Sequence, residues 1–502
     1  MLKKLAELIS RKPVVGWAIF AVVMVAVFIL GLLAASITER RAEIATLYAN
    51  KVIEIKGINA KNEQWGLNYP REYNTWKKTK DMDFSSKHLG NTPEDVLETR
   101  PKMVVLWAGY AFSRDYSAPR GHMYALEDMR ATLRVGSPDA THADLQPSTC
   151  WTCKSPDVPR MMEELGIAEF YKDAWSANGA EIVNPIGCAD CHDPETMQLA
   201  ISRPALVEAY ERQGRDIADA TPQEMRSLVC AQCHVEYYFK GKEDKYLTFP
   251  WDEGMTVEQM EDYYDNVNVA HVDWVHALSR TPMLKAQHPD YELFTMGPHG
   301  QRGLSCADCH MPYRSEGGIK YSDHQITSPL KNISSTCQTC HRDSEENLMA
   351  YVYEYQDKAL EIRDRVEVEL SKAHILAKTA WDNGATDAAM AEVLKYIRQA
   401  QWRWDYAVAS HGGSFHAPVE TQRILAHSLD RSMQAQLELQ KVLYTLGVED
   451  VKMPDISTKA KAQKYIGLDM ETLRSDKDAW LETTPPAWLQ EATAKGKKVA
   501  EV

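Results

Sequence analysis

The stretch Cys150-Trp151-Thr152-Cys153-Lys154 contains the first of five cysteine pairs that share the spacing Cys-x-x-Cys. In the other four pairs, histidine directly follows the second cysteine. These four read Cys188-Ala189-Asp190-Cys191-His192, Cys230-Ala231-Gln232-Cys233-His234, Cys306-Ala307-Asp308-Cys309-His310 and Cys337-Gln338-Thr339-Cys340-His341. The five pairs use all ten cysteines of the chain, and random placement would not give this arrangement. The pattern therefore decides how the chain is interpreted.

Cys-x-x-Cys-His is the attachment motif of a c-type haem, in which the thiols form thioether bonds and the histidine binds the iron. A single motif would leave open a redox dithiol or half of a zinc site. Disulfide pairing of all ten cysteines is a further alternative in an oxidising compartment, but it does not explain the recurring histidine. Four complete motifs and one near-copy favour a multihaem cytochrome.

Lysine stands at position 154, where the other four motifs have histidine. A lysine amine binds iron only when it is neutral, which requires desolvation or the metal itself to lower its pKa. One interpretation is a degenerate motif that has no haem, or whose iron takes its ligand from elsewhere. The other is a haem with Lys154 below the iron and an open position above it, where a substrate can bind. The spacing favours the second interpretation.

The remaining haems are electron carriers if each iron has a second histidine ligand. The chain has 16 histidines, and the four in the motifs leave 12 candidates for four positions. This count permits bis-histidine ligation without choosing among the candidates.

The composition sets broad limits. The 502 residues are enough for a large core or two fused lobes, and a hydrophobic content of 44% is ordinary for a globular protein. The 57 Lys and Arg residues against 71 Asp and Glu give a net charge of −14. Because a nucleic-acid partner requires a basic face, this balance argues against one.

The N-terminus carries a long apolar segment. No charged residue lies between Val14 and Ile37, and Lys3, Lys4, Arg11 and Lys12 precede this segment. Its length favours an uncleaved membrane anchor, with a long signal peptide cut near Ala34-Ala35-Ser36 as the alternative. Since haem c is attached outside the cytoplasmic membrane, the body of the protein is expected on the periplasmic side.

Four regions follow from the sequence. Residues 1–37 form the cytoplasmic N-terminus and anchor, or a signal peptide. Residues 38–342 form a pentahaem catalytic domain of short helices and loops, because haems supply much of the core. Residues 343–447 are predicted to form long helices for packing and dimerisation, over 343–383, 386–410 and 418–446, with helical spacing of apolar residues. Residues 448–502 are expected to form a polar surface tail.

The order of one lysine motif and four histidine motifs resembles pentahaem cytochrome c nitrite reductase, the ammonia-forming enzyme. The likeness runs from about Trp107 to the last long helix. It includes Arg120-Gly121-His122-Met123-Tyr124, Cys233-His234-Val235-Glu236-Tyr237, Lys285-Ala286-Gln287-His288-Pro289 and His416-Ala417-Pro418. The resemblance implies a mainly α, multihaem cytochrome c fold with short helices and loops around five haems, plus long C-terminal helices.

The resemblance also implies the site residues. The catalytic group is Arg134, Tyr237 and His288 beside the haem of Lys154. The distal haem ligands correspond to His122, His299, His324 and His416. His411 is a nearby histidine that could be mistaken for His416. One calcium ion per chain, beside five covalently bound haems c, corresponds to the Glu236 side chain, the carbonyls of Tyr237 and Lys285, and the Gln287 side chain. Carboxylate and carbonyl oxygens suit this hard cation.

The implied function is periplasmic six-electron reduction of nitrite to ammonium at the lysine-ligated haem, fed by four bis-histidine haems. The implied partners are a membrane tetrahaem quinol dehydrogenase, or alternatively a soluble pentahaem cytochrome, and a second copy of the chain. A cytochrome that only transfers electrons is one rival, and Lys154 argues against it. Octahaem enzymes are another rival, but they carry eight motifs.

Overall fold

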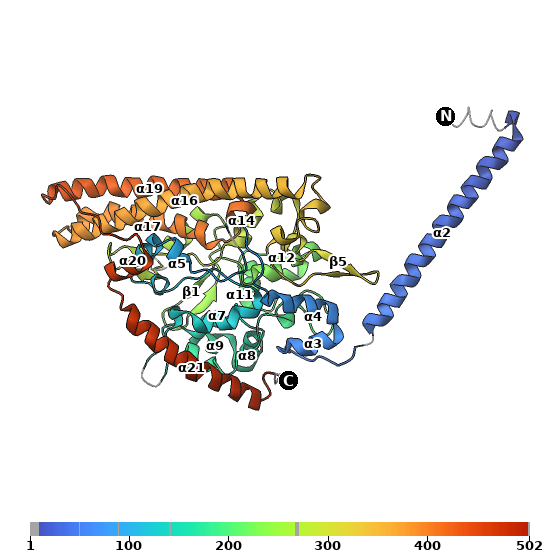
Figure 1. The fold of residues 1–502 in the computed structure, drawn as a ribbon, viewed down its shortest axis with the longest axis horizontal. Helices are drawn as coiled ribbons and strands as arrows, with labels where there is room; N and C mark the ends of the chain where they lie inside the picture. Colours follow the sequence, from blue (N-terminus) through green and yellow to red (C-terminus); the bar gives the residue numbers. More distant parts are fainter. Residues whose placement is uncertain (1–9, 50, 89, 140–141, 267–270, 500–502) are drawn as a thin grey trace. The chain divides into compact units, whose positions relative to one another are not determined.

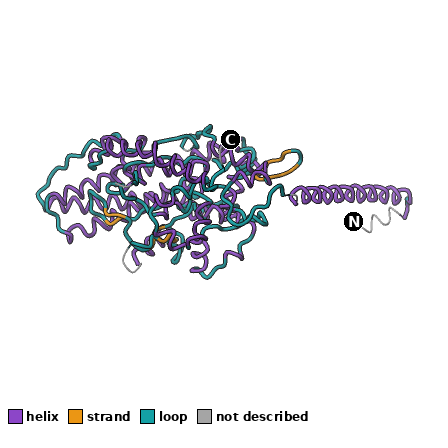
Figure 2. Tube along the Cα trace, turned by 90° about the horizontal axis from the view of Figure 1, so that it is seen from below, coloured by secondary structure: helices purple, strands orange, loops and turns teal. Residues whose placement is uncertain are grey.

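A computed structural model describes residues 10–49, 51–88, 90–139, 142–266 and 271–499. The chain divides into two compact units. One consists of Met1–Glu54 with Ser315–Lys320, and the other of Ile55–Arg314 with Tyr321–Val502. Helices dominate, as the sequence predicted, and Figure 2 shows strands only in short pieces.

The first unit contains the long helix α2 (Pro13–Ala49). Within it, Pro13–Arg41 is 29 residues long and contains an 18-residue window with a mean hydropathy of 3.0 that is not buried. The helix is thus long and apolar enough to cross a membrane. A signal sequence near the N-terminus would meet the same criterion.

The second unit begins with short helices and turns that surround the cysteine motifs. The helices are α3 (Asn62–Asn68), α4 (Pro70–Lys77), α5 (Val96–Thr99), α6 (Lys102–Leu106), α7 (Ala125–Ala131), α8 (Asp157–Leu165), α9 (Ile167–Lys172), α10 (Cys188–Cys191), α11 (Pro204–Arg212), α12 (Pro222–Ala231), α13 (Val257–Asn266), α14 (Asp290–Met296) and α15 (Cys306–His310). The 3₁₀ turns that matter for the site are η3 (His122–Tyr124), η4 (Leu133–Val135), η5 (Ser148–Trp151) and η10 (Cys337–Thr339).

The sequence of two motifs explains why they form helical turns. In α10, Asp190 accepts a hydrogen bond of 2.7 Å from the backbone N–H of Gly187. In α15, Asp308 accepts one of 2.7 Å from Ser305 in the same way. Because each aspartate satisfies an N–H group at the start of its helix, the Cys-Ala-Asp-Cys-His sequence favours a tight turn that brings its two cysteines together.

Strands are short and pair only as hairpins. β1 (Tyr238–Lys240) pairs antiparallel with β2 (Tyr246–Thr248), and β3 (Trp274–Val275) with β4 (Pro282–Met283). A third two-stranded sheet joins β5 (Tyr313–Glu316) and β6 (Ile319–Ser322).

The three predicted long helices are present as α16 (Glu345–Asp382), α17 (Asp387–Ala409) and α19 (Pro418–Thr445), with the short α18 (Gly413–His416) before the last. Ser344 and Thr386 cap the first two by accepting hydrogen bonds from Asn347 and Ala389. The three long helices lie side by side in Figure 1. Val366, Ile397 and Leu439 are buried in their shared core.

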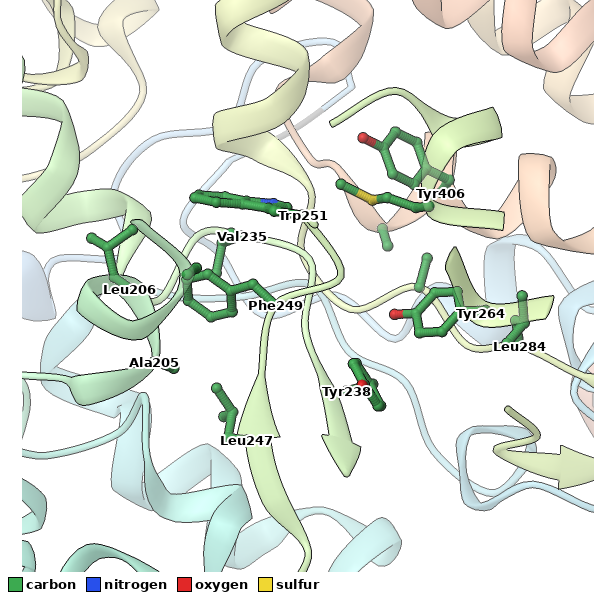
Figure 3. Close-up of a cluster of buried hydrophobic side chains, with 14 of the residues drawn as sticks. Ala205, Leu206, Val235, Tyr238, Leu247, Phe249, Trp251, Tyr264, Leu284 and Tyr406 are labelled. Atoms are coloured by element: carbon green, nitrogen blue, oxygen red, sulfur yellow. The ribbon is translucent and has the colours of Figure 1, made fainter. Parts of the chain in front are cut away.

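A second apolar cluster lies among the short elements and holds the chain around the motifs. Figure 3 shows Val235, Phe249 and Trp251 packed with Tyr264 and Tyr406. Val235 directly follows the third motif, so this packing fixes the segment that continues to Glu236 and Tyr237.

The predicted surface tail contains two helices that the sequence analysis did not describe. It forms α20 (Lys459–Tyr465) and α21 (Met470–Ala494), and Pro485 and Pro486 lie inside α21. Trp480 is buried and donates a hydrogen bond of 2.9 Å to the carbonyl of Pro138. Tertiary contacts of this kind outweigh the polar composition and the helix-breaking prolines.

Candidate active site

Each of the four motif histidines faces one of the four predicted distal histidines. The ring centres are 6.3 Å apart for His234 and His122, 6.2 Å for His192 and His324, 6.3 Å for His310 and His416, and 6.2 Å for His341 and His299. These partners are distant in the sequence, so the fold brings them together.

The common spacing fits one metal ion between two imidazoles. A metal–imidazole bond is about 2.0 Å, and the ring nitrogen lies about 1.1 Å from the ring centre, so two ligands on opposite sides of an iron have ring centres about 6.2 Å apart. Aromatic pairs in general span about 4.5–7 Å, so the recurrence of one spacing in all four pairs is the informative observation. The residues therefore fit four bis-histidine haems.

Backbone carbonyls orient three of these rings. Nδ1 lies 3.0 Å from Met197 O in His192, 3.0 Å from Thr327 O in His310 and 2.8 Å from Ser322 O in His324. A proton on Nδ1 leaves Nε2 as the electron-pair donor toward a metal. Burial lowers the pKa of His192 to about 4, which favours the neutral ring that can bind iron.

All ten cysteines lie in the described part of the chain, and none is in a disulfide. The Cys153 side chain lies near that of Cys233, and the Cys230 side chain lies near that of Cys306. The third motif is therefore close to the first and the fourth. Cys309 lies near Cys337 and Cys230 near Cys191, so the fifth motif is close to the fourth and the second to the third. The five attachment sites thus form one connected group.

The lysine motif is rigidly held. Trp151 is fully buried and stacks on Trp175 with ring centres 4.5 Å apart. Thr149 donates a hydrogen bond of 2.7 Å to the carbonyl of Lys245. Lys154 is half-buried, and its charge acts on both motif cysteines and on His122.

Arg134 lies beside this motif. Its Nε donates a hydrogen bond of 3.1 Å to Thr132 Oγ1, and its guanidinium carbon lies 4.4 Å from the ring centre of Phe112. Burial raises the pKa of Cys150 to about 12, while the positive charges of Lys154 and Arg134 oppose this rise. The guanidinium is therefore close to the first cysteine of the lysine motif.

Tyr237 and His288 lie near the same motif. Burial raises the pKa of Tyr237 well above its usual value, and the charges of Cys153 and Cys150 act in the same direction. The charge of His288 acts on Cys153, and its ring centre lies 4.4 Å from that of His234. The three predicted catalytic side chains therefore lie near the lysine motif.

Asp290 is a neighbour of His288 that the sequence analysis did not identify. Its Oδ2 lies 2.9 Å from His288 Nε2. Burial alone would raise the pKa of Asp290, but hydrogen bonding to His288 and the charges of His288, His416 and His411 hold it well below its usual value. Asp290 is thus a buried, ionised carboxylate beside the predicted catalytic histidine.

The predicted calcium ligands also lie together. Glu236 is fully buried, and its carboxylate accepts hydrogen bonds of 2.6 Å from Gln287 N and 3.3 Å from Tyr264 Oη. The Gln287 amide lies 3.3 Å from the carbonyl oxygen of Lys285. Burial raises the pKa of Glu236 well above its usual value, and Glu292 and Asp273 raise it further.

A bound cation would lower the electrostatic cost of burying these carboxylates. Buried carboxylates that repel one another are costly unless a positive charge neutralises them. The Lys285 amine offsets this charge only in part: it lowers the pKa of Glu236, but it also forms a 2.8 Å ion pair with Asp405. The set of carboxylate, amide and carbonyl oxygens therefore fits a hard divalent cation.

Residues 61–498 match the family model described as cytochrome c552. The chain belongs to the cytochrome c552 family. It is 65% identical to cytochrome c-552 of Bacteroides thetaiotaomicron over 483 residues, which cover 96% of this chain and 97% of that protein. It is 62% identical to cytochrome c-552 of Porphyromonas gingivalis over 487 residues, 97% of each chain.

A solved structure has the same fold. Cytochrome c nitrite reductase from Desulfovibrio desulfuricans, whose catalytic subunit is described with two calcium sites, superimposes with a TM-score of 0.75. It is 31% identical, and the match covers 84% of this chain and 91% of that one. The predicted multihaem cytochrome c fold is thereby confirmed for this cytochrome c552.

Three further histidines, His411, His276 and His374, lie outside the four facing pairs. His411 lies near the site, with its ring centre 5.2 Å from that of His288. His276 and His374 are both buried, and their rings stack with centres 3.7 Å apart. No local motif marks this pair, since His276 follows a strand residue and His374 lies within α16.

Proposed function

We propose that this cytochrome c552 reduces nitrite to ammonium with six electrons at the haem attached to Cys150 and Cys153. Four histidine pairs with a common spacing of 6.2–6.3 Å support the proposal, because they offer a second ligand for every motif except the one with Lys154. The residues that surround the lysine motif are a fixed cation, a phenol and an imidazole. The cation can bind an anionic substrate, and the phenol and the imidazole can donate protons to it.

Each side chain has a role that its chemistry allows. Arg134 binds the nitrite oxygens, because a guanidinium is always charged and donates two parallel hydrogen bonds to an anion. His288 donates protons, since imidazole exchanges protons near neutral pH. Tyr237 donates a hydrogen bond or a proton to the partly reduced nitrogen species.

Lys154 would hold the iron of the haem at this motif, and that haem would supply electrons and a binding position for nitrite. Haems at the other four motifs would pass electrons to this site, and the closeness of the motif cysteines supports such a route. His122, His299, His324 and His416 are the distal ligands of these four haems.

A calcium ion is proposed at Glu236, Gln287 and the carbonyls of Tyr237 and Lys285. Gln287 immediately precedes His288, and Tyr237 immediately follows Glu236. An ion held by these groups fixes the backbone on both sides of the two proton donors. It also adds positive charge that attracts an anionic substrate.

The N-terminal helix supports a periplasmic enzyme anchored in the cytoplasmic membrane, with signal cleavage as the alternative. A membrane tetrahaem quinol dehydrogenase is then the proposed electron donor, ahead of a soluble pentahaem cytochrome. We also propose a homodimer formed by α16 and α19. These helices expose large apolar side chains, namely Tyr351, Tyr355, Met433, Leu437 and Tyr444.

Electron paramagnetic resonance of the purified oxidised protein tests the proposal. One of five haems should be high-spin, and added nitrite should change that signal and leave the low-spin signals intact. Five low-spin haems that do not respond to nitrite would instead indicate a cytochrome that only transfers electrons.

A further inference from the structure

Asp290 contacts two parts of the chain that serve different sites. It is the first residue of α14 and follows His288-Pro289. Its side chain is buried, although no metal or haem role is assigned to it. A buried carboxylate is costly unless hydrogen bonds and charges stabilise it, so each of its contacts is informative.

One carboxylate oxygen faces the predicted catalytic histidine. Asp290 Oδ2 lies 2.9 Å from His288 Nε2, which is hydrogen-bonding distance. The bond fixes the rotation of the imidazole and selects its tautomer. A proton donor must be held in one geometry, because small displacements of a reacting group reduce the rate strongly.

The other oxygen faces the segment that carries His416. Asp290 Oδ1 accepts hydrogen bonds of 2.6 Å from Ser410 Oγ and 3.0 Å from Gly412 N. It also lies 3.8 Å from His416 Nδ1, a buried atom without a hydrogen-bond partner among the described residues. The carboxylate charge is therefore close to a ring that faces His310 at the fourth motif.

We propose that Asp290 is a positioning residue that fixes His288 for proton delivery and places a negative charge beside His416, the distal haem ligand of the fourth motif. This inference rests on the proposed function, because it assigns the proton-donor role to His288. It adds a physical connection between the residue that delivers protons and a haem that supplies electrons.

Steady-state kinetics of the holoenzyme test the first part. Asp290→Asn should lower kcat for nitrite roughly tenfold or more while KM changes at most about twofold, because Arg134 still binds the anion. Ser410→Ala is the matched control, since it removes a donor to the same carboxylate but keeps the charge and the His288 bond. It should stay within about twofold of the native kcat. A native kcat in Asp290→Asn would overturn the proposal.

A double-mutant cycle separates positioning from a merely structural role. If Asp290 acts through His288, Asp290→Asn should reduce kcat little further in a His288→Asn background. If the two substitutions instead reduced kcat by independent factors that multiply, this part would be overturned.

If Asp290→Asn fails to load five haems, Asp290→Glu serves instead. It keeps the charge but displaces the carboxylate, so kcat should fall roughly threefold or more, and an unchanged kcat would overturn the proposal.

Spectroelectrochemical titration tests the second part independently of turnover. Asp290→Asn should shift the midpoint potential of at least one low-spin haem to a more positive value, because a nearby negative charge stabilises the oxidised form, and the carboxylate lies near both His416 and His234. Asp290→Glu should leave that potential near the native value. Absence of any shift in Asp290→Asn would overturn the connection to His416. If the native protein does not reduce nitrite, the proposed function fails, whereas this potential shift still reports on Asp290.

Discussion

The ring centres of His310 and His416 lie 6.3 Å apart, although α16 and α17 separate the two residues in the chain. The fourth cysteine motif thus receives its facing histidine from the segment between two long helices. The same spacing recurs in three further pairs, so the long helices and the motif region form one haem-binding body.

Replacing His324 with methionine tests the assignment of a distal ligand. His324 faces His192 across 6.2 Å, and methionine in place of a histidine ligand raises the potential of a haem. One haem should become easier to reduce, as measured by spectroelectrochemical titration. His142→Met is the control, because His142 is exposed and pairs with Asp139. Five unchanged potentials in His324→Met would exclude the residue as a ligand.

Lys154→His tests the proximal ligand. The change completes a fifth Cys-x-x-Cys-His motif, so haem attachment should persist. Because histidine is a different iron ligand from an amine, kcat for nitrite should fall roughly tenfold or more. The measurement is turnover with reduced methyl viologen, normalised to haem content. The control is Lys245→His, at a neighbouring residue whose contact with Thr149 uses only the backbone carbonyl. Native turnover in Lys154→His would contradict the assigned role.

Removal of the cation should affect both activity and stability. Glu236→Gln removes the buried charge that would bind calcium, and a chelator should act on the native protein in the same direction. Both treatments should lower Tm and kcat, and added Ca²⁺ should restore only the chelated native protein. Glu243→Gln changes an exposed residue and should leave both quantities unchanged. A chelator-insensitive Tm, with no calcium detected by elemental analysis, would exclude the ion.

The buried pair of His276 and His374 predicts a loss of stability in acid. Burial lowers the pKa of His374 to about 4 and that of His276 well below its usual value. The unfolded chain takes up protons below about pH 6.5, whereas the folded pair remains neutral. Their contribution to stability is therefore complete above pH 6.5 and decreases as the pH falls toward 4.

Thermal unfolding followed by circular dichroism measures this decrease. His374→Gln removes one titrating ring and should make Tm depend less steeply on pH between 6.5 and 4. His427→Gln is the control, because the His427 side chain is half-exposed. If Tm of the native protein and of His374→Gln fell equally between pH 6.5 and 4, the histidine pair would not contribute to the loss of stability in acid.

The sequence predicted those features that local motifs encode. Cys-x-x-Cys spacing located five haem sites, and helical periodicity placed α16, α17 and α19 within a few residues of their ends. Local motifs did not predict the distal histidines, because counting left 12 candidates and only the family resemblance selected among them. Their positions depend on contacts between distant segments, which spacing alone does not encode.

The features that the sequence analysis did not predict also depend on contacts between distant segments. Asp290 has no motif of its own, and its importance becomes visible only when the fold brings Ser410 and His416 to it. The helix α21 was not predicted, because its segment is polar and contains Pro485 and Pro486. The side chain of Lys477 stabilises that helix through a hydrogen bond of 2.6 Å to Gly136 O, far away in the sequence.

The most direct measurement is the product of nitrite reduction. Purified protein with reduced methyl viologen should convert each nitrite to one ammonium and consume six electrons, without release of nitric oxide or nitrous oxide. Arg134→Ala should raise KM for nitrite in the same assay. Accumulation of nitrogen oxides, or unconsumed nitrite beside fully reduced haems, would contradict the account.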